Sequence, residues 1–132
     1  MFKSIQIQTQ DKMTMVEVID PIREFIAEQQ RKTGILIVTV PHTTASIILH
    51  KNYDEEIQSD FMRAVQRLAP QDIVYQYIEG NSPAQIITSI LGNSLTLIVN
   101  DGHIELGMFQ SVFLCEFDGA RKRSVYLKFI AD

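Results

Sequence analysis

Polar side chains able to bind or catalyse gather in one short run of the chain. Residues 41–46, Pro-His-Thr-Thr-Ala-Ser, place the imidazole of His42 beside the hydroxyl groups of Thr43, Thr44 and Ser46. The run follows a β-branched apolar segment, so we expect it at a strand end, where a loop on a rigid scaffold can meet a ligand. His42 is the candidate catalytic proton carrier. The alternative is a turn whose hydroxyls bond the local backbone, as threonine and serine readily do.

A second polar segment leads into a predicted helix. Ser82-Pro83-Ala84-Gln85 has the pattern of a capping box with proline in the first turn. The free N–H groups at such a helix start favour phosphate or carboxylate. The candidate ligand-binding residues here are Glu79, Asn81, Ser82 and Gln85. The alternative is simply a capped helix entry preceded by a loop.

Further candidates lie near the C-terminus. Gln110 and Glu116 fall on a predicted strand, and a buried polar side chain needs a partner. Either a structural hydrogen bond or a ligand contact would satisfy them. Arg121 opens a basic cluster after an Asp-Gly step, which is either a solvated hairpin turn or an anion-binding element.

No metal or other cofactor is expected. The three histidines, His42, His50 and His103, show none of the close spacings typical of zinc sites. Cys115 is the single cysteine, which excludes an internal disulfide and fits a reducing cytoplasm. We expect Cys115 to be a small buried apolar residue and not a nucleophile.

Composition narrows the class of protein. The 132 residues predict one domain over residues 1–132, with 45% apolar and 21% charged residues. The net charge of −4 argues against a nucleic-acid partner, because phosphate neutralisation needs a basic surface. No apolar run is long enough to span a membrane, so no membrane partner is expected.

The apolar periodicity predicts an α+β fold with a mixed, mostly antiparallel sheet and about three helices. The expected order is strand-strand-helix twice, then a helix and the terminal strands, in which Asp-Gly steps make turns. Gly34 is expected to end the first helix as a left-handed cap. The expected strands are residues 2–8, 13–19, 35–40 and 46–50, followed by the antiparallel unit 94–129. The expected helices begin at Asp20, Asp54 and Ser82.

Four motifs resemble one family. These are His-Thr-Thr-Ala-Ser, Glu-Gly-Asn-Ser, Leu-Gly-x-Ser-Leu and Gly-x-Phe-Gln, which occur in the expected order across most of the chain. The chain resembles the YjbQ-like proteins, which are named as secondary thiamine-phosphate synthase enzymes. The resemblance implies a cytoplasmic homotrimer that joins a phosphorylated pyrimidine to a thiazole phosphate.

The resemblance also exposes departures from the family pattern. It implies that His42 acts with two further histidines, and these positions are occupied by Tyr77 and Gln85. The family lysine corresponds to Ile87, and the usual Asn-Glu pair to His50-Lys51. The expected three-histidine site therefore cannot form from these positions.

Two functions remain open from the sequence. One is a thiamine-phosphate synthase-like enzyme of weak activity, using His42, the helix entry at Ser82, and Arg121 or Arg123 for charge. The other is a non-catalytic, ligand-binding or structural trimer that keeps the scaffold. In either case a small anionic or phosphorylated ligand is expected near His42.

Overall fold

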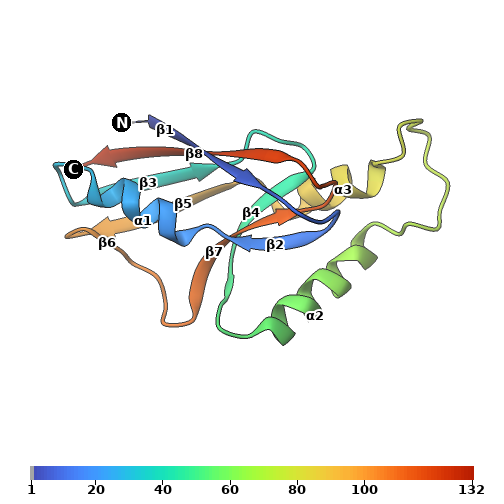
Figure 1. Ribbon diagram of the computed structural model, residues 1–132, viewed down its shortest axis with the longest axis horizontal. Coiled ribbons are helices and arrows are strands. Elements are labelled where there is room, and N and C mark those ends of the chain that lie inside the picture. The colour runs from blue at the N-terminus through green and yellow to red at the C-terminus, as the bar shows by residue number, and fades with distance from the viewer. Residues whose placement is uncertain (1) are drawn as a thin grey trace.

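The largest sheet joins the two ends of the chain. The computed structural model describes residues 2–132, in which β1 and β8 pair antiparallel along their length (Figure 1). Along β8, Val125, Leu127 and Phe129 are buried while their neighbours are more exposed, so one sheet face meets the core. Its strands in spatial order are β1 (Phe2–Gln8), β8 (Lys122–Ala131), β3 (Gly34–Thr39), β5 (Ser94–Asn100) and β6 (His103–Ile104).

A smaller sheet forms the middle layer of the molecule. Its spatial order is β2 (Thr14–Glu17), β7 (Gln110–Glu116) and β4 (Ala45–Lys51). One face packs on the large sheet through Ile47, Val112 and Leu114. The other face carries Ile48 and Phe113 to the helices. Burial on both faces explains why these strands read as continuous apolar runs without alternation.

Helices cover the cores on two sides. The helices are α1 (Ile19–Ala27), α2 (Glu55–Val65), the short 3-10 helix η1 (Gln66–Leu68) and α3 (Ser82–Leu91). From α1, Phe25 and Ile26 enter the core between the sheets. Val65 of α2 and Ile87 of α3 pack on the outer face of the small sheet. Each of these three α-helices therefore packs its apolar stripe against one of the two cores.

The outer face of the large sheet has no cover among residues 2–132. Ile35 lies directly opposite both Ile98 and Ile130, so three apolar side chains form a row across adjacent strands. Their exposed fractions are 43%, 64% and 49% respectively. The helices of this chain therefore leave an apolar face open.

The predicted α+β class and the three helices are confirmed, and so is the order of elements. The sheet differs in detail, because the strands form two sheets and all six pairings are antiparallel. No helix within residues 2–132 is long and apolar enough to cross a membrane.

Three predictions about helix ends were wrong. Asp20 was expected to begin and cap the first helix, but α1 begins at Ile19 after the N-cap Val18, with no side-chain cap bond. The first helix ends at Ala27, and Gly34 instead opens β3, where a Cβ atom would stand 2.2 Å from the carbonyl oxygen of Ile130. Gly34 therefore permits a close approach of two strands. The predicted capping box is also absent, because Asn81 is the N-cap of α3 and makes no side-chain cap bond. Asp54 does cap α2, accepting from Glu56 N–H at 3.0 Å.

Candidate functional site

His42 lies in the connection between β3 and β4, and its side chain accepts a hydrogen bond from the backbone of β8 just beyond the last β3–β8 residue pair. Pairing between β3 and β8 stops at Thr39 and Tyr126, which leaves the next backbone donor of β8 without a strand partner. The N–H of Ser124 donates to Nε2 of His42 at 2.9 Å. The imidazole thus takes the place of a strand carbonyl and satisfies a backbone group.

The surroundings of His42 favour its neutral form. Burial is the largest cause that lowers its pKa below 6.5, followed by the positive charge of Arg123. Arg121 lowers it further, while Glu116 acts in the opposite direction. A neutral imidazole whose Nε2 accepts a hydrogen bond carries its proton on Nδ1. His42 therefore offers an N–H donor at its free nitrogen.

A buried ion pair lies beside this histidine and joins the two sheets. Arg123 and Glu116 have side chains that are 2% and 0% exposed, and Arg123 Nε donates to Glu116 Oε1 at 2.8 Å. Arg123 Nη2 also contacts the other carboxylate oxygen. Thr9 Oγ1 donates to Glu116 at 2.8 Å, and the N–H of Asp118 donates at 3.0 Å. Such a pair is stable only when its remaining polar groups are satisfied, as they are here.

The charge state of Glu116 follows from these bonds. Burial alone would raise its pKa, but the hydrogen bond from Arg123 and those from Asp118 and Thr9 outweigh burial and lower the pKa below 4.5. Glu116 is therefore held as a carboxylate. Both of its carboxylate oxygens accept hydrogen bonds from groups of the protein itself.

Of the three hydroxyl side chains that follow His42, two are buried and one is exposed. Thr44 is buried, and its Oγ1 accepts from Arg123 at 2.7 Å while its carbonyl accepts from Phe117 N–H at 3.1 Å. Ser46 is fully buried, with its hydroxyl 3.5 Å from the carbonyl oxygen of Thr88. Thr43 alone is exposed beside His42. The predicted site thus keeps one free hydroxyl from this run.

The second predicted segment forms a separate surface hollow. Tyr77, Ser82 and Gln85 line a hollow of about 490 Å³ on the outer side of α3, and His42 is not among its lining residues. Tyr77 donates its hydroxyl proton to Glu79 at 3.0 Å, which is the main reason that the pKa of Tyr77 is raised. The structure brings Tyr77 and Gln85 together, but within one chain it does not bring them to His42.

The other candidates make local structural bonds. Asn81 Nδ2 donates to Asp118 Oδ2 at 3.1 Å. Arg121 also holds Asp118, through Nη2 at 3.1 Å. Gln110 Oε1 accepts the N–H of Gly107 at 2.8 Å and so closes the turn before β7. Of these residues, Arg121 keeps an exposed cationic side chain close enough to His42 to affect it.

The remaining reactive residues lie apart from this site. His50 packs against Phe61 with ring centroids 4.9 Å apart, and His103 is exposed on β6. Cys115 is buried, and burial raises its pKa to about 12, so its thiol is inert at neutral pH. Within residues 2–132, no three His, Cys, Asp or Glu side chains are grouped to hold a metal ion.

Ile87 shows that one departure has a packing role. It is 1% exposed and belongs to the core between α3 and the small sheet. A lysine at this position would place its stem in that core. The residue that the family resemblance reads as a lost cation is here part of the hydrophobic interior.

Sequence reasoning named Arg123 as part of the basic cluster but missed that its side chain is buried. Arg123 occupies an inward position of β8, in phase with Val125 and Leu127. A cation at an apolar phase of a strand is a signal for a buried ion pair, because charged side chains are almost never buried alone. Thr9 and Asp118, which complete the network, carry no comparable signal.

Comparison with known proteins gives a consistent result. The sequence model of a family described as "UPF0047 protein YjbQ-like" matches residues 3–132. UPF0047 protein MJ1081 of Methanocaldococcus jannaschii is 39% identical over 96% of this chain and 92% of its own length. UPF0047 protein YugU of Bacillus subtilis is 33% identical over 97% of this chain and 98% of its own length.

A solved structure agrees with these sequence matches. It is an uncharacterised conserved protein of the YjbQ/UPF0047 family from Clostridium acetobutylicum, with a TM-score of 0.93 and 30% identity. The match covers 97% of this chain and 99% of that chain. None of these three names states an activity.

Proposed function

This chain belongs to the YjbQ-like UPF0047 family, and we propose that it binds a small phosphorylated or otherwise anionic ligand beside His42. The observation that carries the proposal is the hydrogen bond from Ser124 N–H to His42 Nε2. That bond fixes the proton of the neutral imidazole on Nδ1, so the free nitrogen is a donor. Nδ1 has no hydrogen-bond partner among residues 2–132, which leaves it available to a ligand oxygen.

The charges around His42 support an anion. Arg121 and Arg123 both act electrostatically on the imidazole, and Glu116 is already paired with Arg123. Arg121 remains partly exposed, at 52% of its side chain. Thr43 adds an exposed hydroxyl next in the chain. A donor N–H, a hydroxyl and a guanidinium form a suitable set for phosphate oxygens.

Thermal denaturation with and without ligand tests this proposal. Inorganic phosphate or a phosphorylated pyrimidine should raise the melting temperature, because a ligand that binds only the folded state stabilises it. The His42→Ala variant should lose that increase, whereas His103→Ala, altered at an exposed position on β6, should keep it. Equal responses in the two variants would count against binding at His42.

A second candidate function is weak thiamine-phosphate synthase-like transfer. Joining a phosphorylated pyrimidine to a thiazole phosphate expels pyrophosphate, whose charge needs donors or cations. The Nδ1–H group of His42, with Arg121 nearby, could supply them. A direct synthase assay distinguishes the two functions: product formation that depends on His42 favours the enzyme, and binding without turnover favours the binding protein.

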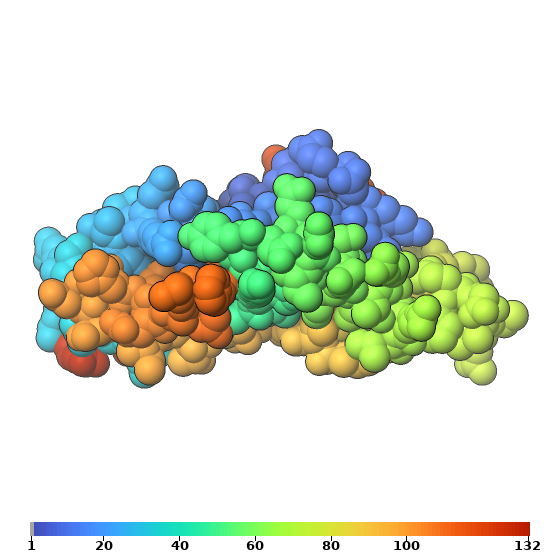
Figure 2. All heavy atoms as spheres, turned by 90° about the horizontal axis from the view of Figure 1, so that it is seen from below, coloured from blue at the N-terminus to red at the C-terminus, as the bar shows by residue number. Residues whose placement is uncertain are grey.

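We also propose a homotrimer. One apolar surface is the row Ile35, Ile98 and Ile130 on the large sheet. Another is the segment between η1 and α3, where Val74 is 99% and Ile78 96% exposed. Figure 2 shows this yellow-green segment projecting at one end of the long axis. Two different patches on one chain favour a heterologous contact, which closes into a ring when the rotation permits.

A further inference from the structure

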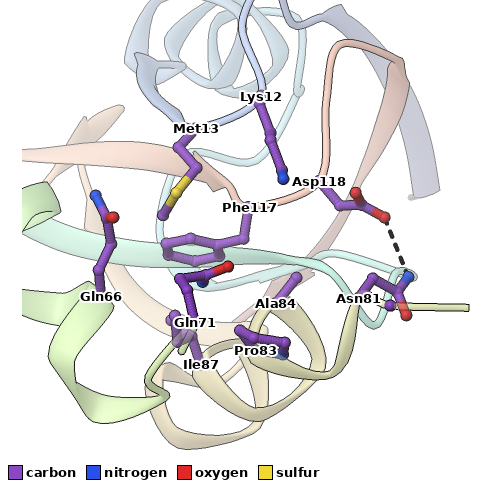
Figure 3. A pocket seen from close by; sticks show the side chains of 11 residues that line it. Lys12, Met13, Gln66, Gln71, Asn81, Pro83, Ala84, Ile87, Phe117 and Asp118 are labelled. Carbon is purple, nitrogen blue, oxygen red and sulfur yellow. Dashed lines mark hydrogen bonds between the residues drawn. The ribbon is translucent and has the colours of Figure 1, made fainter. Parts of the chain in front are cut away.

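A cavity of about 220 Å³ lies between the start of α3, η1 and the end of β7 (Figure 3). Met13, Ile87 and Phe117 provide apolar surface, while Lys12, Asn81 and Asp118 provide polar groups. His42 does not line the cavity, nor do Tyr77 and Gln85. The cavity is therefore a different place from both predicted binding segments.

The charges at its rim do not cancel. Asp118 is already held by Arg121 Nη2 at 3.1 Å and by Asn81 Nδ2 at 3.1 Å. Lys12 makes no ion pair within the described part of the chain, and in Figure 3 its ammonium group extends toward Phe117 and Asp118. The rim thus offers one unneutralised positive charge above an apolar floor.

We propose that this cavity binds a small organic monocarboxylate, with its carboxylate on Lys12 Nζ and its apolar body against Met13, Ile87 and Phe117. The volume equals that of about seven water molecules at roughly 30 Å³ each. It is below the roughly 300–1,000 Å³ of pockets that take drug-sized ligands. A single-ring acid fits this size, and a nucleotide does not.

The charge balance favours a monoanion over a phosphate ester. A phosphate monoester carries close to two negative charges at neutral pH. Lys12 can neutralise one of them, and the second would face the carboxylate of Asp118. A carboxylate presents one charge and leaves an apolar remainder, which matches one cation and an apolar floor. This site is independent of the anion proposed at His42.

Protein-detected NMR with sodium benzoate tests the proposal on the full chain. Benzoate should shift the amide signals of Met13, Ala84 and Phe117 in a saturable way at millimolar concentration. Benzyl alcohol, which has a similar ring and no charge, should bind about tenfold or more weakly, as expected for loss of a charge-assisted contact. Inorganic phosphate should leave these signals unchanged.

Variants locate the charge and the cavity. Lys12→Gln should weaken benzoate binding about tenfold or more, whereas Lys122→Gln, an equivalent change at an exposed position of β8, should not. Ala84→Leu should fill the cavity and abolish binding. Its melting temperature would establish that it folds, and Lys12→Gln tests the site independently. His42→Ala should leave benzoate binding intact.

Three results would overturn the assignment. They are no saturable shift at Met13 and Phe117, equal benzoate affinity in Lys12→Gln and the wild type, and tighter binding of phosphate than benzoate at the same residues.

Discussion

Arg123 and Glu116 make the most consequential polar contact in the core. Arg123 lies on the inner face of the large sheet, and Glu116 ends the central strand of the small one. Because both side chains are almost fully buried, removing one leaves the other as an uncompensated charge. The candidate ligand-binding residue Glu116 therefore has a structural explanation without any ligand.

The Arg123→Ala variant should lose about 3–5 kcal/mol of unfolding free energy. Urea denaturation measures this loss, and Arg121→Ala is the control. The control should lose at most about 1 kcal/mol, because the Arg121–Asp118 pair is partly exposed. The double variant Arg123→Met with Glu116→Leu should recover much of the stability. Equal losses in Arg123→Ala and Arg121→Ala would contradict a buried pair.

His42 should make stability depend on pH. Its pKa is lower in the folded state than the ordinary value of 6.5, so the unfolded chain binds the proton more readily. Its contribution to stability is present above about pH 6.5 and declines as the pH falls below that value. Unfolding free energies measured above and below pH 6.5 should show this slope in the wild type. The slope should be reduced in His42→Gln and retained in His103→Gln.

At the scale of elements, the close contact at Gly34 sets the register of β3 against β8. Gly34 pairs with Ala131, and an added Cβ would stand 2.2 Å from Ile130 O and 2.8 Å from Ala131 Cα. These neighbours are backbone atoms, which cannot turn aside as a side chain can. Only a residue without a side chain fits between the strands.

Gly34→Ala should destabilise the protein by about 1–3 kcal/mol, the usual cost of overpacking. Chemical denaturation provides the measurement. Gly107→Ala is a matched control, since its nearest neighbour is the flexible Gln110 side chain at 3.3 Å. A Gly34→Ala variant as stable as the control would show that the strands separate easily at this point.

Sequence periodicity predicted the elements better than their ends. Alternation and amphipathic stripes identified the strands and the three helices, because those patterns report which face is buried. The role of Gly34 was missed, since a glycine after a helix can equally end that helix or admit a neighbouring strand. The N-cap of α3 was displaced by one residue, from Ser82 to Asn81, while the helix itself begins at Ser82. Helix boundaries of this kind depend on local geometry.

The candidate site was predicted less completely. The motif identified His42, but its partner is a backbone N–H of Ser124, which no side-chain pattern encodes. The Arg123–Glu116 pair joins two sheets, so its existence depends on how those sheets pack. The sequence grouped Thr44 and Ser46 with His42, whereas the fold turns both into the interior.

At the scale of the whole molecule, the open face of the large sheet predicts self-association. Light scattering at micromolar concentration should give three times the mass of one chain. Ile98→Glu should shift the protein toward a monomer, because it places a charge in the centre of the apolar row. Glu24→Gln, an exposed change on α1, which packs on the inner face of the large sheet, should leave the mass unchanged. A wild-type monomer would exclude the proposed trimer.

The strand order also has a consequence for how a new chain matures on the ribosome. β8 lies between β1 and β3, and β7 lies between β2 and β4, so each sheet is joined by a strand that comes later in the chain than the strands it links. Before Gln110 is made, β3, β5 and β6 can pair with one another, but nothing links β1 to them or β2 to β4. Stable folding of both sheets must therefore wait until β7 and β8 have been made. Until then, the apolar strands depend on rapid completion or on chaperones for protection from aggregation.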